Sequence, residues 1–412
     1  MPYSKIKKIH AREILDSRGN PTLEVDLETN LGLFRSSVPS GASRGKYEAA
    51  EIRDGGKRYQ GKGVLKAVSN INSIIAPRLK EKEVIKQREI DDFLIKLDGS
   101  KNKSFLGANA ICAVSMAVCR AGAKSKKLSL WKYIAGLVGN KKPGLPKACF
   151  NVINGGAHAG NDLDFQEFMI VPQARSFSNN LQIGSETYHQ LKEMIKEKYG
   201  KLAVNVGDEG GFALPVKIPE EAIEIVLAAA KKLGYLEKMK MILDVAATQF
   251  FVSEKYNTQF GVFDSNEMVR YYSDLLSKYA IIGLEDPMAE EDLLGWKLLR
   301  EKTETSKILL IGDDLLVTNT EKIKKAKKEN LCNAMILKIN QIGTVTEALE
   351  AAKLAKSYGW KIVVSHRSGE TEDDFIADLA VGIGAEFIKT GAPARSERLA
   401  KYNRLLRIEE EI

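Results

Sequence analysis

The sequence predicts an α/β protein in which a smaller N-terminal α+β domain precedes a larger eight-stranded β/α barrel. The chain has 412 residues, more than one ordinary hydrophobic core usually holds, which favours one large domain and a smaller one. Apolar and polar residues alternate near the N-terminus, as they do in antiparallel strands. Eight short apolar runs follow, and helical segments separate the later ones, as in parallel βα units.

The N-terminal domain is expected to span residues 1–137 and to contain an antiparallel sheet. Residues 4–60 alternate apolar and polar, for example in TLEVDLETNLGLFRSSVPS, so one face of this sheet should contact water. From about Gly63 to Ala123 the pattern becomes helical, and GANAICAVSMAVCRAGA predicts the clearest helix. The stretch VGNKKPGLP, residues 138–146, is rich in Gly, Pro and Lys and marks a domain boundary.

The barrel is expected to span residues 138–412. Its strands are predicted from apolar runs that end in polar residues: CFNVINGGAH, FMIVP, MILDVAA, IIGLEDP, ILLIGDD, MILKINQ, IVVSHRS and FIKTGAP. From Leu243 onward, helical segments such as NEMVRYYSDLLSKY and TVTEALEAAKLAKSYG separate them. Eight such strands predict a closed barrel, whose C-terminal strand ends open on one face, where catalytic groups gather.

Composition and charge describe a soluble globular protein, with 44% hydrophobic and 28% charged residues. The first residues, MPYSKIKKIHARE, contain no apolar signal-peptide core, and no apolar run approaches the ~18 residues that a membrane-spanning helix needs. We therefore expect a cytoplasmic protein without a membrane partner. The net charge of +8 comes from lysines scattered at helical spacing, which favours solvated helix faces over nucleic-acid binding.

The four cysteines do not have the spacing of a metal site. Cys112 and Cys119 lie seven residues apart on the predicted helix, so they should share one face as small buried hydrophobic residues. A disulfide framework is not expected in a chain of this size without an export signal.

Six successive strands end in an ionisable residue, which predicts an active site at the mouth of the barrel. These residues are Asp244, Glu285, Asp313, Lys338, His366 and Lys389, with separations of 41, 28, 25, 28 and 23 residues. Each separation is about one βα unit, so the side chains should converge on one pocket. A single acid at such a position could be an ordinary loop residue, but six in succession favour an active site.

Asp244, Glu285 and Asp313 predict a site for a divalent cation. Three neighbouring carboxylates without a cation would repel and raise one another's pKa. An oxygen set without Cys or His ligands suits Mg²⁺ or Mn²⁺ rather than Zn²⁺. The alternative is that each acid pairs with a neighbouring Lys or Arg.

Lys338 is a candidate general base. Lys389 and the metal should disfavour its ammonium form and lower its pKa toward that of a usable base. The alternative is a salt bridge between Lys338 and one of the acids, which would not exclude catalysis.

Three further motifs carry weaker signals. NVGDEGGFA places Glu209 before a Gly-Gly turn, and GGAHAGNDLDFQEF contains His158 and Glu167. A surface turn and a packed histidine are the plain alternatives. VPSGASRGKYEA, residues 38–49, lacks the spacing of an ATP-binding phosphate loop, and GGAHAG is not a dinucleotide fingerprint. The stretch Ser40–Gly45 instead predicts a mobile lid that carries hydroxyl groups.

Taken together, the motifs resemble the enolase family over essentially the whole chain. DSRGNPT, VPSGAS, GGAHAGN, QEFMIVP, GDEGGFA, LEDP, GDDLLVTN, LKINQIGT, SHRSGETED and KTGAPARSERLAKYNRLLRIEEE stand in the family's order. The resemblance implies an enolase-type barrel and the reversible, Mg²⁺-dependent dehydration of 2-phospho-D-glycerate to phosphoenolpyruvate in glycolysis and gluconeogenesis. It also implies a homodimer, or an octamer assembled from dimers.

The resemblance further assigns roles to individual residues. Asp244, Glu285 and Asp313 would hold the first Mg²⁺, and Ser40 would reach a second that arrives with substrate. Lys338 would remove the C2 proton, and Glu209, supported by Glu167, would protonate the departing C3 hydroxyl. The residues that would bind the substrate are Arg367 and Ser368 at its phosphate, Lys389 at its carboxylate, and His158, Gln166 and His366 around it.

The sequence departs from the family pattern in the lid, where Arg44 replaces a usual Thr, and at Gln249, which replaces a common Glu. Two rival functions follow. One is a related barrel enzyme with a non-phosphorylated substrate, which Arg367, Ser368 and the lid argue against. The other is an inactive family member that serves as a scaffold or RNA-associated protein, which the intact acid, base and metal positions argue against.

Overall fold

Three antiparallel strands and a layer of helices form the N-terminal part of the chain, as the sequence pattern predicted. The computed structural model describes residues 4–42 and 45–412, and its N-terminal sheet has the order β1-β2-β3. Its strands are β1 (Lys8–Leu15), β2 (Pro21–Thr29) and β3 (Gly32–Ser37). Leu23, Val25 and Leu27 of β2 are fully buried, whereas Asp26 between them pairs with Arg12 on β1. This alternation sets the side of the sheet that packs on the helices.

The helical layer contains the helix that the sequence predicted most clearly. The helical elements are η1 (Arg58–Gly61), α1 (Leu65–Ser69), η2 (Asn70–Ile75), α2 (Ala76–Leu79), α3 (Gln87–Asp98), α4 (Ala108–Ser125) and α5 (Leu130–Val138). Helix α4 is apolar on nearly all sides and almost completely buried, between the sheet and its neighbouring helices. Cys112 and Cys119 are buried on it, and all four cysteines are free thiols, as predicted.

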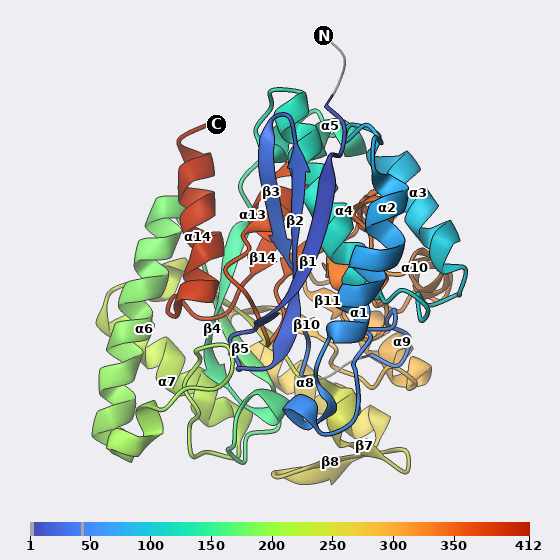
Figure 1. Ribbon diagram of the computed structural model, residues 1–412. Helices are drawn as coiled ribbons and strands as arrows, with labels where there is room; N and C mark the ends of the chain where they lie inside the picture. Colours follow the sequence, from blue (N-terminus) through green and yellow to red (C-terminus); the bar gives the residue numbers. More distant parts are fainter. Residues whose placement is uncertain (1–3, 43–44) are drawn as a thin grey trace.

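All eight predicted apolar runs become strands of one closed barrel, with the order β10-β11-β12-β13-β14-β4-β5-β6. In Figure 1 the N-terminal sheet lies in front of this barrel. The strands are β4 (Lys147–Asn154), β5 (Glu167–Pro172), β6 (Met239–Asp244), β10 (Ile281–Glu285), β11 (Leu309–Gly312), β12 (Ala334–Leu337), β13 (Lys361–Ser365) and β14 (Phe387–Lys389). Met169, Ile242, Ile336 and Val363 belong to the cluster of apolar side chains that fills the interior. The opposite strand faces pack on the outer helices, which explains why the runs are apolar without alternation.

The outer layer of the barrel consists mainly of α-helices. These are α6 (Phe177–Tyr199), α7 (Pro219–Lys232), α8 (Ser265–Lys278), α9 (Leu293–Lys302), α10 (Thr320–Lys328), α11 (Ile339–Ile342), α12 (Val345–Ser357), α13 (Phe375–Ile383) and α14 (Ser396–Glu409). Short elements connect them: η3 (Gly156–His158), η4 (Lys201–Val204), η5 (Leu236–Lys238), η6 (Ala247–Phe250) and the small sheet β7 (Phe251–Val252), β8 (Lys255–Thr258) and β9 (Gly261–Phe263). Among the described helices, none has the length and hydropathy needed to cross a lipid bilayer.

One strand of the barrel runs opposite to the others. Strand β5 is antiparallel to both neighbours, β4 and β6, whereas the other barrel pairs are parallel. The connection from β4 to β5 has no crossover helix, and such a connection favours an antiparallel pair. As a result the first residue of β5, Glu167, pairs with Asp244 at the end of β6. The reversed strand therefore still delivers an acid to the mouth of the barrel.

Candidate active site

The six ionisable residues predicted at strand ends all lie at the same end of the barrel. Asp244, Glu285 and Lys389 are the last residues of β6, β10 and β14. The other three, Asp313, Lys338 and His366, follow β11, β12 and β13 by one residue. Five of the six border one cavity with about 330 Å³ of atom-free space, part of which is open to solvent. The sixth, Glu285, accepts a hydrogen bond from Lys389, which borders the cavity.

Lys389 lies at the centre of the acidic cluster. Its Nζ donates to Glu285 Oε1 at 2.8 Å, to Asp244 Oδ2 at 3.2 Å and to both carboxylate oxygens of Glu167 at 3.3 Å. Burial alone would lower the pKa of Lys389, but these three carboxylates raise it well above its usual value. The lysine is therefore charged and balances part of the negative charge of the cluster.

Lys338 forms the salt bridge that was the alternative to a lowered pKa. Its Nζ contacts Asp313 Oδ2, and Gln341 Nε2 donates to Asp313 Oδ1 at 2.9 Å. Burial by itself lowers the pKa of Lys338, but the Asp313 carboxylate outweighs it and raises the pKa. Without a cation beside Asp313, the neighbouring charge that dominates at Lys338 is therefore negative, and the lowered pKa expected beside a bound metal stays a prediction.

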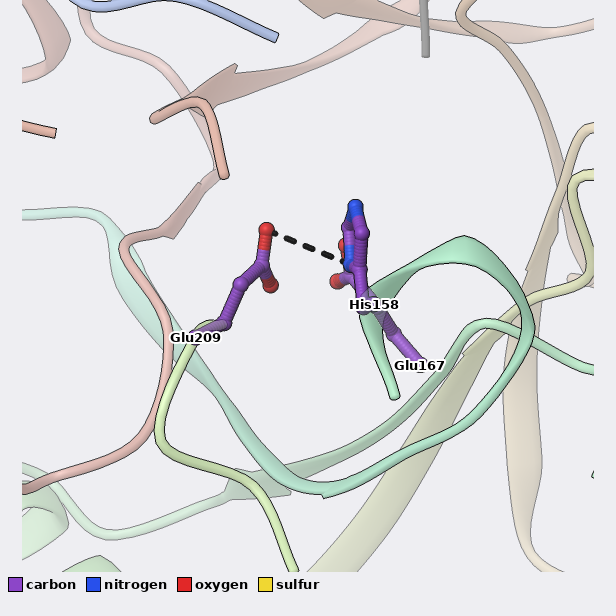
Figure 2. A group of neighbouring side chains, drawn as sticks. All are labelled: His158, Glu167 and Glu209. Carbon is purple, nitrogen blue, oxygen red and sulfur yellow. Dashed lines mark ion pairs between the residues drawn. The ribbon is translucent and has the colours of Figure 1, made fainter. Parts of the chain in front are cut away.

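Glu167, Glu209 and His158 form a second group on another side of the cavity (Figure 2). Each residue offers one ligand atom, and these atoms lie within 4.8 Å of one another. His158 Nδ1 is 3.5 Å from Glu209 Oε1 and 3.7 Å from Glu167 Oε1. Burial lowers the pKa of His158, which keeps the imidazole neutral at neutral pH. The group is therefore two carboxyl groups that face one uncharged imidazole.

The two carboxyl groups of this cluster have pKa values shifted in opposite directions. Burial and the nearby Glu209 charge raise the pKa of Glu167 well above its usual value. Burial would also raise the pKa of Glu209, but His366, His158 and Arg398 lower it well below its usual value. Of the two interacting acids, Glu167 therefore holds a proton more readily than Glu209.

Neighbouring amides orient this part of the site. Asn151 Nδ2 donates to Glu209 Oε2 at 2.9 Å. Gln166 Nε2 donates to Asp244 Oδ2 at 3.3 Å, and its own Oε1 accepts from Gln249 Nε2 at 2.7 Å. Asn151 was missed by the sequence analysis, and its only signal was a polar residue inside the apolar run CFNVIN. The Asp244 carboxylate can only accept, so it orients the Gln166 amide, and Gln249, which replaces a common family Glu, donates to the other end.

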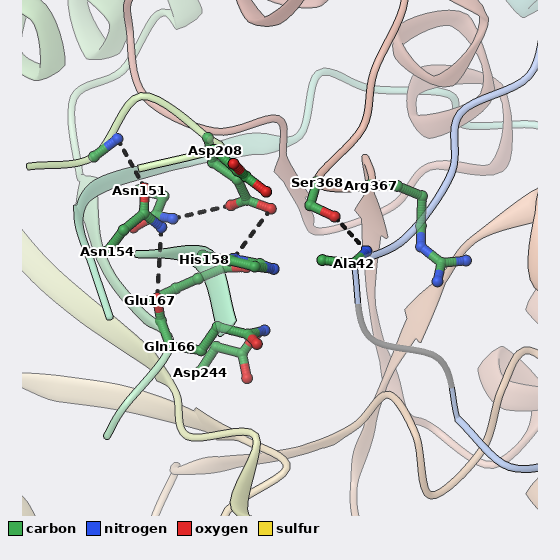
Figure 3. Close-up of polar contacts among 12 residues, drawn as sticks. Ala42, Asn151, Asn154, His158, Gln166, Glu167, Asp208, Asp244, Arg367 and Ser368 are labelled. Atoms are coloured by element: carbon green, nitrogen blue, oxygen red, sulfur yellow. Dashed lines mark hydrogen bonds and ion pairs between the residues drawn. The ribbon is translucent and has the colours of Figure 1, made fainter. Parts of the chain in front are cut away.

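Arg367 and Ser368 lie across the cavity from His158 and Glu167 (Figure 3). Both nitrogens of the Arg367 fork contact Glu48, at 3.1 and 3.0 Å. Ser368 Oγ accepts from the Ala42 N–H at 2.6 Å. Glu48 was not predicted as a site residue: it is the third residue after the stretch Ser40–Gly45 and had no other signal.

Ser40 does not border the cavity, although Gly41 and Ala42 do. The Ser40 hydroxyl accepts from Arg53 Nη2 at 2.9 Å and donates to Glu51 Oε2 at 3.1 Å. Its backbone N–H donates to the Gly369 carbonyl at 2.8 Å. Arg44, the unusual residue of the expected lid, lies outside the described residues. A metal-binding role for Ser40 would therefore require its present hydroxyl contacts to break.

The predicted metal ligands have the chemistry for a divalent cation but not yet its geometry. Two groups among the described residues bring three ligand atoms within 4.8 Å: His158 with Glu167 and Glu209, and Asp286 with Asp313 and Asp314. Asp244, Glu285 and Asp313 do not form such a group, since the two lysines hold their oxygens. Glu285 Oε2, however, is buried and has no hydrogen-bond partner among the described residues, and the set contains only oxygen donors. An orphaned buried oxygen in an all-oxygen set fits Mg²⁺.

Comparisons with known proteins agree with this architecture. A family model described as "Enolase, C-terminal TIM barrel domain" matches residues 142–412, and one described as "Enolase, N-terminal domain" matches residues 6–134. The two ranges lie on either side of the boundary predicted between residues 137 and 138. The chain is also 54% identical to a protein named enolase from Mastigamoeba balamuthi, over 99% of this chain and 96% of that protein. The chain belongs to the enolase family.

Proposed function

We propose that this chain performs its family's reaction, the reversible dehydration of 2-phospho-D-glycerate to phosphoenolpyruvate, with Lys338 as base and the Glu167–Glu209 pair as acid. One observation carries the proposal. Lys338 directly follows strand β12, and Glu167 is the first residue of strand β5. In the closed barrel of eight strands, β12 and β5 are four strands apart whichever way one counts, so they lie on opposite sides. Base and acid therefore reach the cavity from opposite sides, as removal of a proton and a hydroxyl from opposite faces of the substrate requires.

The base step depends on Asp313, which contacts Lys338 and belongs to the predicted metal set. Bound by Asp244, Glu285 and Asp313, Mg²⁺ would offset the carboxylate charges and stabilise the negative charge that develops on the substrate carboxylate. Once the Asp313 charge is offset, Lys338 loses the partner that raises its pKa. The Lys338 amine can then accept the C2 proton.

The acid step uses the proton of the Glu167–Glu209 pair. Burial and the neighbouring Glu209 charge raise the pKa of Glu167, which favours a proton on this residue. Glu209 lies between His158 and His366, at the cavity wall. We propose that the pair's proton moves to Glu209 and from there to the departing C3 hydroxyl, while Asn151 keeps the Glu209 carboxyl in place.

The remaining residues bind the substrate. Arg367 and Ser368 would bind the phosphate, for which a guanidinium fork and a hydroxyl are well suited. Lys389 would bind the carboxylate, and His158, Gln166 and His366 would enclose the molecule and exclude water. We propose two Mg²⁺ ions per site. Ser40 would be a ligand of the second ion only if its hydrogen bonds to Glu51 and Arg53 break.

Mg²⁺-dependent formation of phosphoenolpyruvate, followed by its ultraviolet absorbance, tests the proposed function. We expect the folded protein to convert 2-phosphoglycerate with Mg²⁺ and to stop when a chelator is added. Lys338→Ala should lower kcat by about 10²–10⁴-fold, the usual contribution of a general base, and should abolish exchange of the C2 proton with solvent. Lys361→Ala is the matched control, because Lys361 begins β13 at the opposite end of the barrel and is exposed.

Two results would contradict the proposal. Folded protein without activity in Mg²⁺ would favour the scaffold function. Undiminished C2 exchange in Lys338→Ala would assign the base to another residue.

We further propose that the chain acts in the cytoplasm as a homodimer or as an octamer of dimers. The family membership supports oligomerisation, and the chain mass is 45.6 kDa. Light scattering coupled to gel filtration should give a particle of two or eight chains. A particle with the mass of one chain would contradict this part of the proposal.

A further inference from the structure

Arg398 is a fully buried cation outside the proposed catalytic set. It lies in the first turn of α14, and its Nη1 is 2.7 Å from His366 Nδ1. The same nitrogen donates to the Arg367 carbonyl oxygen at 2.7 Å. Its Nη2 donates to the carbonyl oxygens of Ser368 at 2.6 Å and Asp208 at 3.0 Å. The guanidinium thus joins α14 to two loops at the cavity, one that carries His366 and one that leads into Glu209.

The contact between Arg398 and His366 allows only one protonation state of the imidazole. A guanidinium has five N–H donors and no acceptor, so Nδ1 of His366 must accept and cannot carry a proton. A neutral imidazole then carries its proton on Nε2. Turning the ring by 180° would place a carbon against the guanidinium and leave a buried donor unsatisfied, which is costly.

The Nε2 of His366 faces Glu209. It lies 3.3 Å from Glu209 Oε2, although the contact is not aligned as a full hydrogen bond and Nε2 has no other partner among the described residues. Catalytic hydrogen bonds are often long in substrate-free sites and tighten on binding. An N–H at this position would donate to the carboxylate of Glu209.

We propose that Arg398 is the positioning residue that holds His366 in its Nε2–H tautomer, with the N–H directed at the Glu209 carboxylate. The surroundings of the imidazole also favour its neutral form. Burial and the charge of Arg398 disfavour protonation of His366, and the opposing charges of Glu209 and Glu370 do not outweigh burial. His366 then acts as a fixed hydrogen-bond donor to Glu209 and not as an imidazolium acid. The importance of Glu209 in turnover rests on the proposed function, whereas the tautomer does not depend on it.

Nitrogen-15 NMR of the histidine side chains tests this directly, because the shifts of the two ring nitrogens distinguish both tautomers and the imidazolium. The chain has four histidines, and His366→Gln assigns the signals of His366. In the wild type we expect an unprotonated Nδ1 and a protonated Nε2 from about pH 6 to about pH 9, a range in which an ordinary histidine titrates. Arg398→Met should lose this single-tautomer signature, and Arg398→Lys, which retains a donor, should restore part of it.

Arg404→Met is the matched control on the same helix. Arg404 pairs with Asp378 at 2.7 Å and does not contact His366, so its loss should leave the His366 signals unchanged. The proposal is overturned if wild-type His366 carries a proton on Nδ1 near neutral pH, a measurement that needs neither turnover nor a stable variant. It is equally overturned if folded Arg398→Met keeps the wild-type signals. Full activity of a folded Arg398→Met that has lost the signature would instead challenge the function of Glu209.

Discussion

His366 shows how burial and one neighbour decide the protonation of a single side chain. Burial is the largest influence and lowers the pKa of His366 to about 4, although Glu209 opposes it. The unfolded chain has no such burial, so its histidine takes up a proton near the usual value of about 6.5. Between these two values the unfolded state binds more protons than the folded state, and the free energy of unfolding falls as the pH falls.

We therefore predict that His366→Gln reduces the pH dependence of stability in the acid range. From about pH 6.5 to about pH 4, the wild type should lose up to about 3 kcal/mol of unfolding free energy through this residue, and the variant should not. Urea denaturation at a series of pH values measures the difference. His189→Gln, at an exposed position on α6, is the control and should follow the wild type. Parallel curves for wild type and His366→Gln would contradict the prediction.

Strands and their last residues could be predicted from the sequence, since apolar runs that end in polar residues are local patterns. All eight runs became barrel strands. The direction of β5 could not be predicted, because the apolar run FMIVP looks the same in either direction. The sequence also could not decide whether Lys338 forms a salt bridge, because only the packed side chains bring Asp313 to its Nζ. Arg398 was missed for the same reason, since its partners are distant in the sequence.

A buried acid connects three helices between the N-terminal part and the barrel. Asp91 on α3 accepts from Ser115 on α4 at 2.7 Å. It also accepts from the backbone N–H and the hydroxyl of Thr346, at the start of α12, at 3.0 and 2.6 Å. Burial raises the pKa of Asp91 even though these donors oppose the shift. Asp91 thus accepts from a backbone N–H in the first turn of α12 that has no acceptor within its own helix.

Asp91→Ala should destabilise the protein without changing its chemistry. The change leaves buried donors on Ser115 and Thr346 without a partner, which costs about 1–3 kcal/mol, and should lower the apparent melting temperature. The activity per folded molecule should remain, because Asp91 does not border the cavity. Asp92→Ala removes the next, exposed acid and should melt like the wild type. Equal melting temperatures for the two variants would refute the role of Asp91.

The charge balance of the barrel includes cations of the chain itself that lie among the buried acids. Lys389 is 2% exposed, and its ammonium contacts three carboxylates that come from three different strands. Removing one partner of a buried ion pair commonly costs about 3–5 kcal/mol, because the remaining charge is left uncompensated. Lys389 therefore contributes strongly to the stability of the barrel.

We predict that a chelator stops the formation of phosphoenolpyruvate but leaves the wild type folded, as judged by circular dichroism. Lys389→Met should lower the melting temperature strongly in the chelator and regain part of the loss when Mg²⁺ is added, since a cation can replace the missing ammonium. Lys401→Met is the matched control: Lys401 is equally buried, but it binds Glu370 outside the acidic cluster. Its loss of stability should not respond to Mg²⁺. Unfolding of the wild type by the chelator would contradict the prediction.

The ammonium of Lys389 has a consequence for the order in which the barrel folds and binds an ion. A newly synthesised chain carries its own counter-charge and can close the barrel before any ion arrives. An ion that the acids bind would then be a late addition to a finished scaffold, so a chain deprived of it would lose activity reversibly and keep its fold.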